Sequence, residues 1–187
     1  YIKVKNSPDI EIQRKWSRNG PVLPKTAFDL SSITPKHHVA ALSWTALTDK
    51  DTTVSAAINL MLSQNVENGL AALESFYAPS VNFLLVDSEK MVIKTVGKMP
   101  KRSPLNETQG RMPSLGWKPE NIWRGYWGYE VNPIIESSPG DVLANTNNKI
   151  SDENFPKHVS HFWGDTQRIL RLQKLMQSRE VHTRESF

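Results

Sequence analysis

The stretch VNFLLVDSEKMVIKTVG, residues 81–97, decides the fold. It holds two runs of β-branched and other apolar residues, 81–87 and 91–97, separated by the polar turn 88–90. Runs of this kind between turn residues predict two strands. A turn this short can join only antiparallel neighbours, so the stretch predicts an antiparallel sheet rather than a parallel one with helical crossovers.

Helices are predicted on both sides of this hairpin. Asp and Thr side chains in segment 49–52 can satisfy the free backbone N–H groups of a helix over 54–63, and Asn65 can cap a second helix over about 66–76. A third helix is predicted over about 166–178. Apolar residues recur at helical spacing in the second and third helices: Leu70, Leu73 and Phe76 in one, and Ile169, Leu172 and Met176 in the other.

Shorter apolar segments predict further strands. Alternating apolar and polar residues predict a strand pair at the start of the chain, and an apolar run with Trp44 predicts a buried strand. The resulting order is strands, helices, strands, an irregular segment, a strand and a helix. It predicts an α+β fold, and we expect residues 1–187 to form a single lobe. The predicted strand segments are 1–5, 10–16, 22–23, 39–47 and 141–146.

The composition is that of an ordinary globular protein and excludes several classes of function. Hydrophobic residues make up 38% of the chain and charged residues 22%. No apolar run approaches the ~20 residues of a membrane-spanning helix, so we expect no membrane span. The net charge is +4, but the basic residues are too scattered to predict a nucleic-acid interface. The absence of cysteine excludes disulfides, thiolate metal ligands and a cysteine nucleophile within the chain.

Segment 98–140 is rich in Pro, Gly and Trp and shows little periodicity. We expect it to wrap over a surface rather than to act as a linker, because its large aromatic side chains need something to pack against. These side chains are Trp117, Trp123, Tyr126, Trp127 and Tyr129.

The stretch GDVLANTNN, residues 140–148, carries the pattern with the most chemical meaning. If a strand ends in these asparagines, sheet geometry can hold a side-chain amide so that its NH2 group points into a cleft. A neutral amide donor suits the oxygen that becomes negative during acyl transfer. The alternative is that Asn147 and Asn148 only form a turn, because Asn tolerates left-handed backbone conformations.

An ordered set of stretches gives the chain a resemblance to a known family. The chain resembles an internal fragment of the large (beta) subunit of the penicillin acylase (penicillin amidase) family of N-terminal-nucleophile (Ntn) hydrolases. No single stretch is specific, but together they cover nearly the whole chain. Besides GDVLANTNN they are RNGPVL (18–23), ALSWTALTDKDTT (41–53), APSVNFLLVD (78–87), GRMPSLGW (110–117), WRGYWGYEVNP (123–133), FP (155–156) and FWGDTQRI (162–169).

The resemblance implies part of an Ntn αββα core, in a precursor that cuts itself to expose a Ser at the start of its large subunit. The Ser hydroxyl attacks an amide carbonyl, and its own α-amine, with an ordinary pKa near ~8, acts as the base. That Ser is expected upstream of Tyr1, so the fragment alone is expected to be inactive. Both ends of the sequence look cut from something longer, which agrees with this expectation.

The resemblance also implies partners and a location. The partners are the remainder of the precursor, which comprises the small subunit and the nucleophile-bearing segment, and a small-molecule acyl amide of the penicillin or N-acyl-homoserine lactone class. The implied location is the periplasm or the outside of the cell. A second hypothesis is a catalytically inactive acylase-like lobe that binds a ligand or a partner. A Gly-Ser self-cleavage junction in the upstream sequence would favour the enzyme.

Four residues are implied as site residues. Asn147 matches the family's oxyanion-stabilising Asn, and Arg168 matches an Arg beside the active site that helps to orient this Asn and the amino end of the nucleophile. Val81 is the better candidate for a side chain lining the acyl pocket, and Ala57 the weaker one. A small or β-branched lining suits an aliphatic acyl chain, as in acyl-homoserine lactone acylases. The alternatives are a surface helix residue for Arg168 and plain core residues for Val81 and Ala57.

Two positions depart from the family pattern. Asn19 precedes Gly-Pro where the family commonly has His. Many members bind a structural calcium, but the position that supplies a carboxylate falls here around His158–Val159, and a hard cation prefers oxygen ligands. We therefore expect no cofactor or metal site within this chain, and the resemblance leaves structural calcium open only for the full-length protein.

Overall fold

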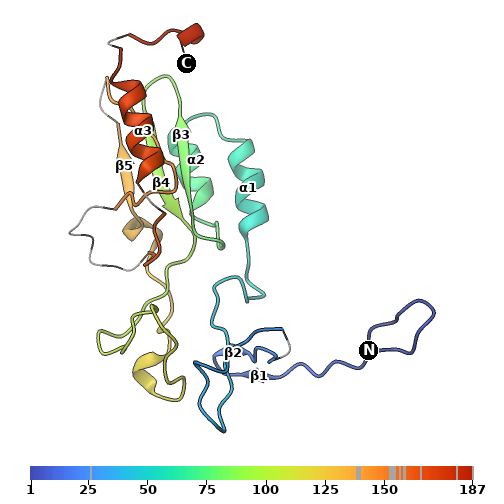
Figure 1. Cartoon of the computed structure of the whole chain (residues 1–187). Helices are drawn as coiled ribbons and strands as arrows, with labels where there is room; N and C mark the ends of the chain where they lie inside the picture. Colours follow the sequence, from blue (N-terminus) through green and yellow to red (C-terminus); the bar gives the residue numbers. More distant parts are fainter. Residues whose placement is uncertain are drawn as a thin grey trace. The chain divides into compact units, whose positions relative to one another are not determined.

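The computed structural model describes residues 1–25, 27–137, 140–151, 155, 157, 159–164, 166–179 and 181–186. The described residues form two compact units (Figure 1). Unit 1 comprises Tyr1–Asp49 and Arg102–Trp123, and unit 2 comprises Lys50–Lys101 and Arg124–Phe187. This division does not decide whether residues 1–187 make one lobe, which stays a prediction.

Unit 2 is built on a three-stranded antiparallel sheet. β3 (Val81–Val86) pairs with β4 (Met91–Val96), which pairs on its other side with β5 (Ile134–Glu136). The register sets Val81 opposite Val96, so the hairpin predicted from residues 81–97 is confirmed. β4 is the central strand and therefore the most deeply buried one; its buried apolar side chains are Val92, Ile93 and Val96.

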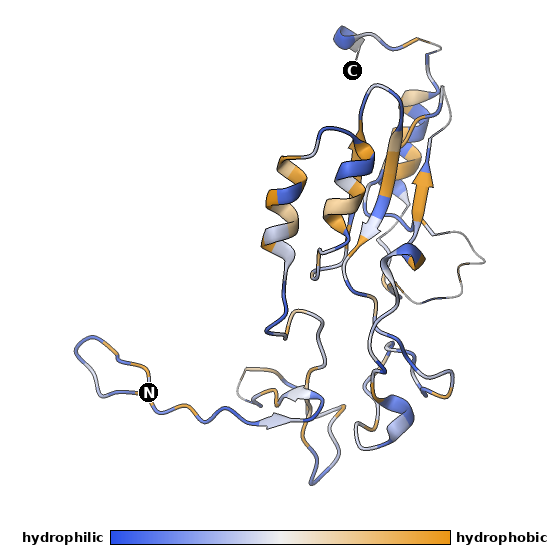
Figure 2. Cartoon of the chain, turned by 180° about the vertical axis from the view of Figure 1, so that it is seen from behind, coloured by the Kyte–Doolittle hydropathy of each residue, from blue (hydrophilic) through white to orange (hydrophobic). Residues whose placement is uncertain are grey.

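Two helices pack beside each other and against this sheet. They are α1 (Thr53–Met61) and α2 (Val66–Leu73), which confirm the two helices predicted before the hairpin (Figure 1). Figure 2 shows that hydrophobic and hydrophilic residues are interleaved along both, as expected of helices with one face on a core. α2 contacts both β3 and β4. The buried core cluster joins helices and sheet through Ala56, Leu73, Phe76 and Val96.

The starts of both helices are held by short polar side chains. The side chain of Asn65 accepts a hydrogen bond from the backbone N–H of Asn68 at 2.9 Å, so the predicted cap of α2 is confirmed. At α1 the cap residue Thr52 makes no side-chain capping bond. Instead, Asp51 Oδ1 accepts from the backbone N–H of Thr53 at 2.9 Å.

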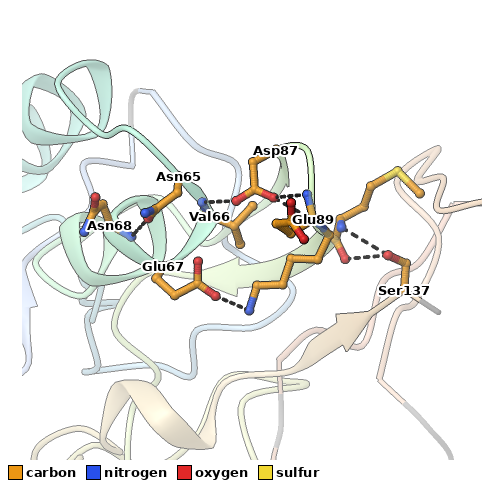
Figure 3. A network of polar contacts seen from close by, with 9 residues as sticks. Asn65, Val66, Glu67, Asn68, Asp87, Glu89 and Ser137 are labelled. Atoms are coloured by element: carbon orange, nitrogen blue, oxygen red, sulfur yellow. Dashed lines mark hydrogen bonds and ion pairs between the residues drawn. The ribbon is translucent and has the colours of Figure 1, made fainter. Parts of the chain in front are cut away.

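Asp87 ties the start of α2 to the turn between β3 and β4 (Figure 3). One carboxylate oxygen accepts from the backbone N–H of Val66 at 2.8 Å, and the other accepts from the backbone N–H groups of Glu89 and Lys90 at 2.8 and 3.0 Å. These backbone hydrogen bonds hold the pKa of Asp87 below its ordinary value of 3.8. Lys90 also forms an ion pair with Glu67 of α2.

A buried lysine anchors the approach to β5. Lys94 of β4 is only 4% exposed, and its Nζ donates to the backbone oxygen of Asn132 at 2.8 Å. The same Nζ lies 4.6 Å from the centre of the Tyr129 ring. Burial lowers the pKa of Lys94. Asn132 Nδ2 donates to the oxygen of Gly97 at 3.0 Å, and the backbone N–H of Thr95 donates to the oxygen of Pro133 at 2.9 Å, so three hydrogen bonds fix the segment before β5 to β4 and to the residue that follows it.

The remaining helices carry little of the core. α3 (Gln167–Met176) confirms the third predicted helix, and none of its residues is buried. Three short 3-10 helices span Pro119–Asn121, Tyr129–Val131 and Arg184–Ser186. No helix formed by the described residues is both long and apolar enough to cross a bilayer.

Unit 1 contains one small hairpin, in which β1 (Trp16–Ser17) pairs with β2 (Gly20–Pro21). Of the predicted strands 1–5 and 10–16, only the bridge between Ile2 and Ile10 and the residue Trp16, which begins β1, are found, and the rest of the prediction is wrong. Among the described residues, the buried apolar side chains all belong to unit 2. Long strands in unit 1 would thus have no core face to cover, and this explains why the alternating pattern does not produce them.

The buried strand predicted over 39–47 is also wrong. Its only pairing among the described residues is a bridge between Val22 and Ala41, which likewise replaces the predicted strand 22–23. Trp44 is 52% exposed, and the chain turns directly after it, where the Leu47 N–H donates to the Trp44 oxygen at 3.0 Å. An apolar run without a neighbouring strand cannot satisfy its backbone in a sheet.

Candidate functional site

Asn147 lies in the irregular segment between β5 and α3. The strand predicted over 141–146 is wrong, because the residues there form no strand. Side chains of Asn145 and Asn148 bond instead to the backbone of this segment, and such local bonds compete with sheet pairing. Asn147 has a φ of 69°, the left-handed conformation of a turn. Its position therefore depends on local hydrogen bonds and not on a strand end.

Arg168 comes from α3 and meets Asn147 directly. Its Nη2 donates a hydrogen bond to Asn147 Oδ1 at 2.9 Å. Both side chains are exposed on the surface of this chain. The structure thus brings together the two residues that sequence reasoning assigned to oxyanion stabilisation.

This hydrogen bond determines which end of the Asn147 amide is free. A guanidinium group carries donors and no acceptor, so Arg168 can bond to the amide oxygen and never to the NH2 group. No described residue accepts a hydrogen bond from Asn147 Nδ2, and the side chain is exposed. The pair therefore presents an oriented, neutral N–H donor, which is the kind of group that stabilises a developing oxyanion.

Arg168 lies in the first turn of α3, where a helix disfavours a positive charge. The N-terminal turn of a helix carries partial positive charge, which disfavours a cation there. Arg168 is the second residue of α3, and the first turn holds no acidic residue to offset it. The contact with Asn147 gives a reason for an Arg at this place, which a plain surface residue would not have.

Lys157, which lies between Asn147 and Arg168 in the sequence, contacts the ring of Trp127. Lys157 Nζ lies 3.9 Å from the centre of this ring, and Lys101 Nζ lies 4.5 Å from it. Cation–π contacts of this kind contribute about 0.5–2 kcal/mol. The backbone N–H of Trp127 donates to the Met99 oxygen at 2.9 Å, which ties this residue to the chain just after β4. Trp127 therefore gives the Lys157 side chain a surface to pack on.

Val81 and Ala57 lie at the edge of the core. Val81 begins β3 and is 36% exposed, on the strand face that it shares with Phe83 and Leu85, which pack against the core cluster. Ala57 is exposed on α1, whereas its neighbour Ala56 is fully buried. Neither residue is a buried core residue. Their assignment to an acyl pocket stays a prediction.

Metal ligands are not gathered anywhere in the described part of the chain. No group of three or more His, Asp or Glu side chains there could hold a metal ion. Of the position considered for calcium, His158 lies outside the described residues and Val159 has no ligand side chain. Asn19, the other departure from the family pattern, donates its Nδ2 to the Gly116 oxygen at 2.8 Å within unit 1.

Sequence reasoning missed the part played by Asn145. Its Oδ1 accepts from the backbone N–H of Asn147 at 3.1 Å. The signal was present in the sequence, because an Asn two residues before a turn residue commonly bonds to that residue's N–H. It was overlooked because residues 141–146 were assigned to a strand.

The chain is similar to proteins of one known family. A family model described as penicillin amidase matches residues 1–187. Acyl-homoserine lactone acylase QuiP of Pseudomonas fluorescens is 26% identical over 162 residues, which cover 87% of this chain and 19% of the relative. QuiP of Pseudomonas syringae pv. tomato is 25% identical over 128 residues, 68% of this chain and 15% of the relative. The chain thus spans about a fifth or less of the length of these curated relatives.

The fold has a close counterpart among solved structures. A thermostable penicillin G acylase from Alcaligenes faecalis superposes with a TM-score of 0.80 at 18% identity, over 98% of this chain and 31% of the other. The predicted class, a mixed helix and antiparallel-sheet part of an Ntn-hydrolase fold, is thereby confirmed.

Proposed function

Because the chain belongs to the penicillin amidase family, we propose that it forms part of the large subunit of an amide hydrolase whose nucleophile lies elsewhere in the full-length protein. The relatives named as acyl-homoserine lactone acylases support acylase chemistry. Since the chain spans only 19% of the first of them, the complete active site is a property of the longer protein.

In the proposed reaction, an N-terminal Ser hydroxyl attacks the amide carbonyl of the substrate. A C–O bond forms, the hydroxyl proton passes to the Ser α-amine, and the carbonyl oxygen becomes an oxyanion. Asn147 Nδ2 donates to that oxyanion. The C–N bond then breaks, the leaving amine takes the proton, and water hydrolyses the acyl-enzyme ester.

The observation that carries this proposal is the hydrogen bond from Arg168 to Asn147 Oδ1 at 2.9 Å. It orients the amide with its donor outward, and it explains an Arg in a helix turn that disfavours cations. A preorganised donor does not have to reorient when the oxyanion forms, and this is why such donors lower a barrier.

The proposed substrates are acyl amides of the N-acyl-homoserine lactone or penicillin class. Val81, with Ala57 as a second candidate, would line the acyl pocket, and their small side chains suit an aliphatic chain. The proposed location is the periplasm or the outside of the cell, after cleavage of a precursor whose other segments complete the site. No residue of this chain is assigned to calcium.

Turnover by the full-length protein tests the proposal. Purified protein is incubated with N-acyl-homoserine lactones of short and long acyl chains and with penicillins, and the release of free amine is measured. Release is expected from the full-length protein and none from residues 1–187 alone. A folded, matured full-length protein that binds these compounds without turnover would support the inactive binding lobe instead, and turnover by the fragment would contradict the proposal.

A further inference from the structure

The backbone of Asn147 needs to be held in place. Its φ of 69° lies in the left-handed region, which a non-glycine residue adopts at some cost, although Asn tolerates it better than most. The side chain is exposed, so burial does not fix it. A donor that must stay aimed at one point in space therefore depends on whatever holds this turn.

Asn145 makes two hydrogen bonds to the backbone of this turn, one to Asn147 and one to the residue after it. Its Oδ1 accepts from the backbone N–H of Asn147 at 3.1 Å, and its Nδ2 donates to the backbone oxygen of Asn148 at 3.1 Å. One side chain thus spans the residue that carries the proposed oxyanion donor. Asn145 itself is half-buried.

Asn148 adds further hydrogen bonds within the same turn. Its Oδ1 accepts from the backbone N–H of Thr146 at 3.0 Å and from the Thr146 hydroxyl at 3.3 Å. Asn145 Nδ2 also lies 3.5 Å from this oxygen. Asn145 and Asn148 are half-buried whereas Asn147 is exposed, so their hydrogen bonds hold the turn from which the Asn147 side chain projects.

We propose that Asn145 and Asn148 are positioning residues, which lock the left-handed turn so that Arg168 can orient the Asn147 amide toward the oxyanion. Arg168 fixes the rotation of the amide, and the two asparagines fix the backbone from which it projects. This inference rests on the proposed function, because it assigns the flanking residues a role only through Asn147.

Loss of the hydrogen bonds from Asn145 and Asn148 would act on the transition state more than on substrate binding. An oxyanion exists only after attack, so a misplaced donor lowers kcat and leaves KM nearly unchanged. A displacement of ~1 Å can cost on the order of 10²-fold in rate. Asn145→Ala should therefore lower kcat by roughly 10- to 100-fold.

The test is a double-mutant cycle in the full-length protein, with the chromogenic p-nitroanilide of a straight-chain fatty acid as substrate. The variants are Asn145→Ala, Asn147→Ala and the double variant. Asn145→Ala should lower kcat in the wild-type background and have almost no further effect in the Asn147→Ala background. Asn145→Ser is the conservative variant, because a hydroxyl forms the same turn contact more weakly. Its kcat should lie between those of the wild type and of Asn145→Ala.

The outcomes separate this inference from the function on which it rests. If Asn147→Ala leaves kcat unchanged, the proposed function fails. If Asn147→Ala lowers kcat but Asn145→Ala does not, the positioning role alone is overturned. An equal loss from Asn145→Ala in both backgrounds would also overturn it, since the residue would then act independently of Asn147. Should Asn145→Ala fail to mature, Asn145→Ser and its double variant with Asn147→Ala give the same comparison.

Discussion

Arg168 Nη2 donates to Asn147 Oδ1 over 2.9 Å, and this contact joins the start of α3 to the left-handed turn after β5. It leaves the amide NH2 as the donor that faces outward.

Arg168→Ala in the full-length protein should lower kcat by about 10-fold or more, because the Asn147 amide can then rotate. The kcat of Arg168→Lys should lie between those of the wild type and of Arg168→Ala, since an ammonium group donates without the planar geometry of a guanidinium. The control is Arg171→Ala, which removes an exposed cation from the same helix and should leave kcat unchanged. Equal losses from both alanine variants would point to helix charge rather than to orientation of the amide.

The stability of the Arg168→Ala variant should move differently from its activity. Removal of a cation from the first turn of a helix is favourable by about 0.3–1 kcal/mol, which offsets the lost exposed hydrogen bond. We therefore expect Tm to stay within a few degrees of wild type while kcat falls. Parallel loss of Tm and kcat in a thermal melt would contradict a specific role at the site.

Val81→Phe should shift substrate preference toward shorter acyl chains. A larger side chain at the mouth of an acyl pocket removes room for methylene groups, each of which contributes roughly 1–3 kcal/mol to discrimination. The ratio of kcat/KM for long over short N-acyl-homoserine lactones should fall at least about tenfold. Val86→Phe, at a 65% exposed position on the opposite face of β3, should leave the ratio unchanged. Equal ratios in wild type and Val81→Phe would remove Val81 from the pocket.

Asp87 should make stability depend on pH in the acid range. Its pKa is lowered in the folded state by backbone hydrogen bonds from Val66, Glu89 and Lys90. The contribution is therefore fully present above the ordinary value of 3.8 and is lost as pH falls through the lowered folded pKa. Asp87→Asn should lower Tm at neutral pH and flatten its decline below about pH 4.

Glu89→Gln is the matched control for Asp87. It removes a carboxylate from the same turn, and among the described residues this carboxylate accepts only from the adjacent Ser88 hydroxyl, at 3.3 Å. Its Tm profile should follow that of wild type. If both variants gave the same profile, the hydrogen bonds of Asp87 to α2 and to the hairpin turn would not be the cause of the pH dependence.

Gly97→Ala should destabilise the protein more than Gly125→Ala. Both glycines have positive φ, 96° and 88°, so an added Cβ is strained at either place by ~1–2 kcal/mol. At Gly97 the Cβ would also lie 2.9 Å from Ser80 Cα, whereas nothing lies within 4 Å at Gly125. Chemical denaturation should show the larger loss for Gly97→Ala, and equal losses would mean that the contact with Ser80 relaxes freely.

The part of the fold that could be predicted is the part with local signals. The hairpin over 81–97, the cap at Asn65 and the three helices follow from periodicity and turn residues. The strands over 39–47 and 141–146 were wrong because an apolar run shows a need for burial but not the presence of a partner strand. β5 at Ile134–Glu136 is short and depends on distant pairing with β4, which no local pattern shows.

The candidate site residues are implied by the family resemblance, and their geometry could not be predicted from the sequence. Asn147 and Arg168 were found through the order of motifs along the chain, and the structure brings them into contact. A strand end was expected to hold the amide, whereas a turn stabilised by Asn145 and Asn148 holds it. Local side-chain bonds override strand propensity here, since Asn and Thr compete for the same backbone groups.

The most direct test of the central claim is kcat of Asn147→Ala in the full-length protein, with maturation verified by the masses of the subunits. Asn6→Ala is the matched control, because Asn6 is also an exposed asparagine with positive φ, 61°, but lies in unit 1. Loss of an oxyanion donor predicts a fall in kcat of roughly 10²–10³-fold at nearly constant KM, with Asn6→Ala unaffected. A matured Asn147→Ala protein with wild-type kcat would contradict the account.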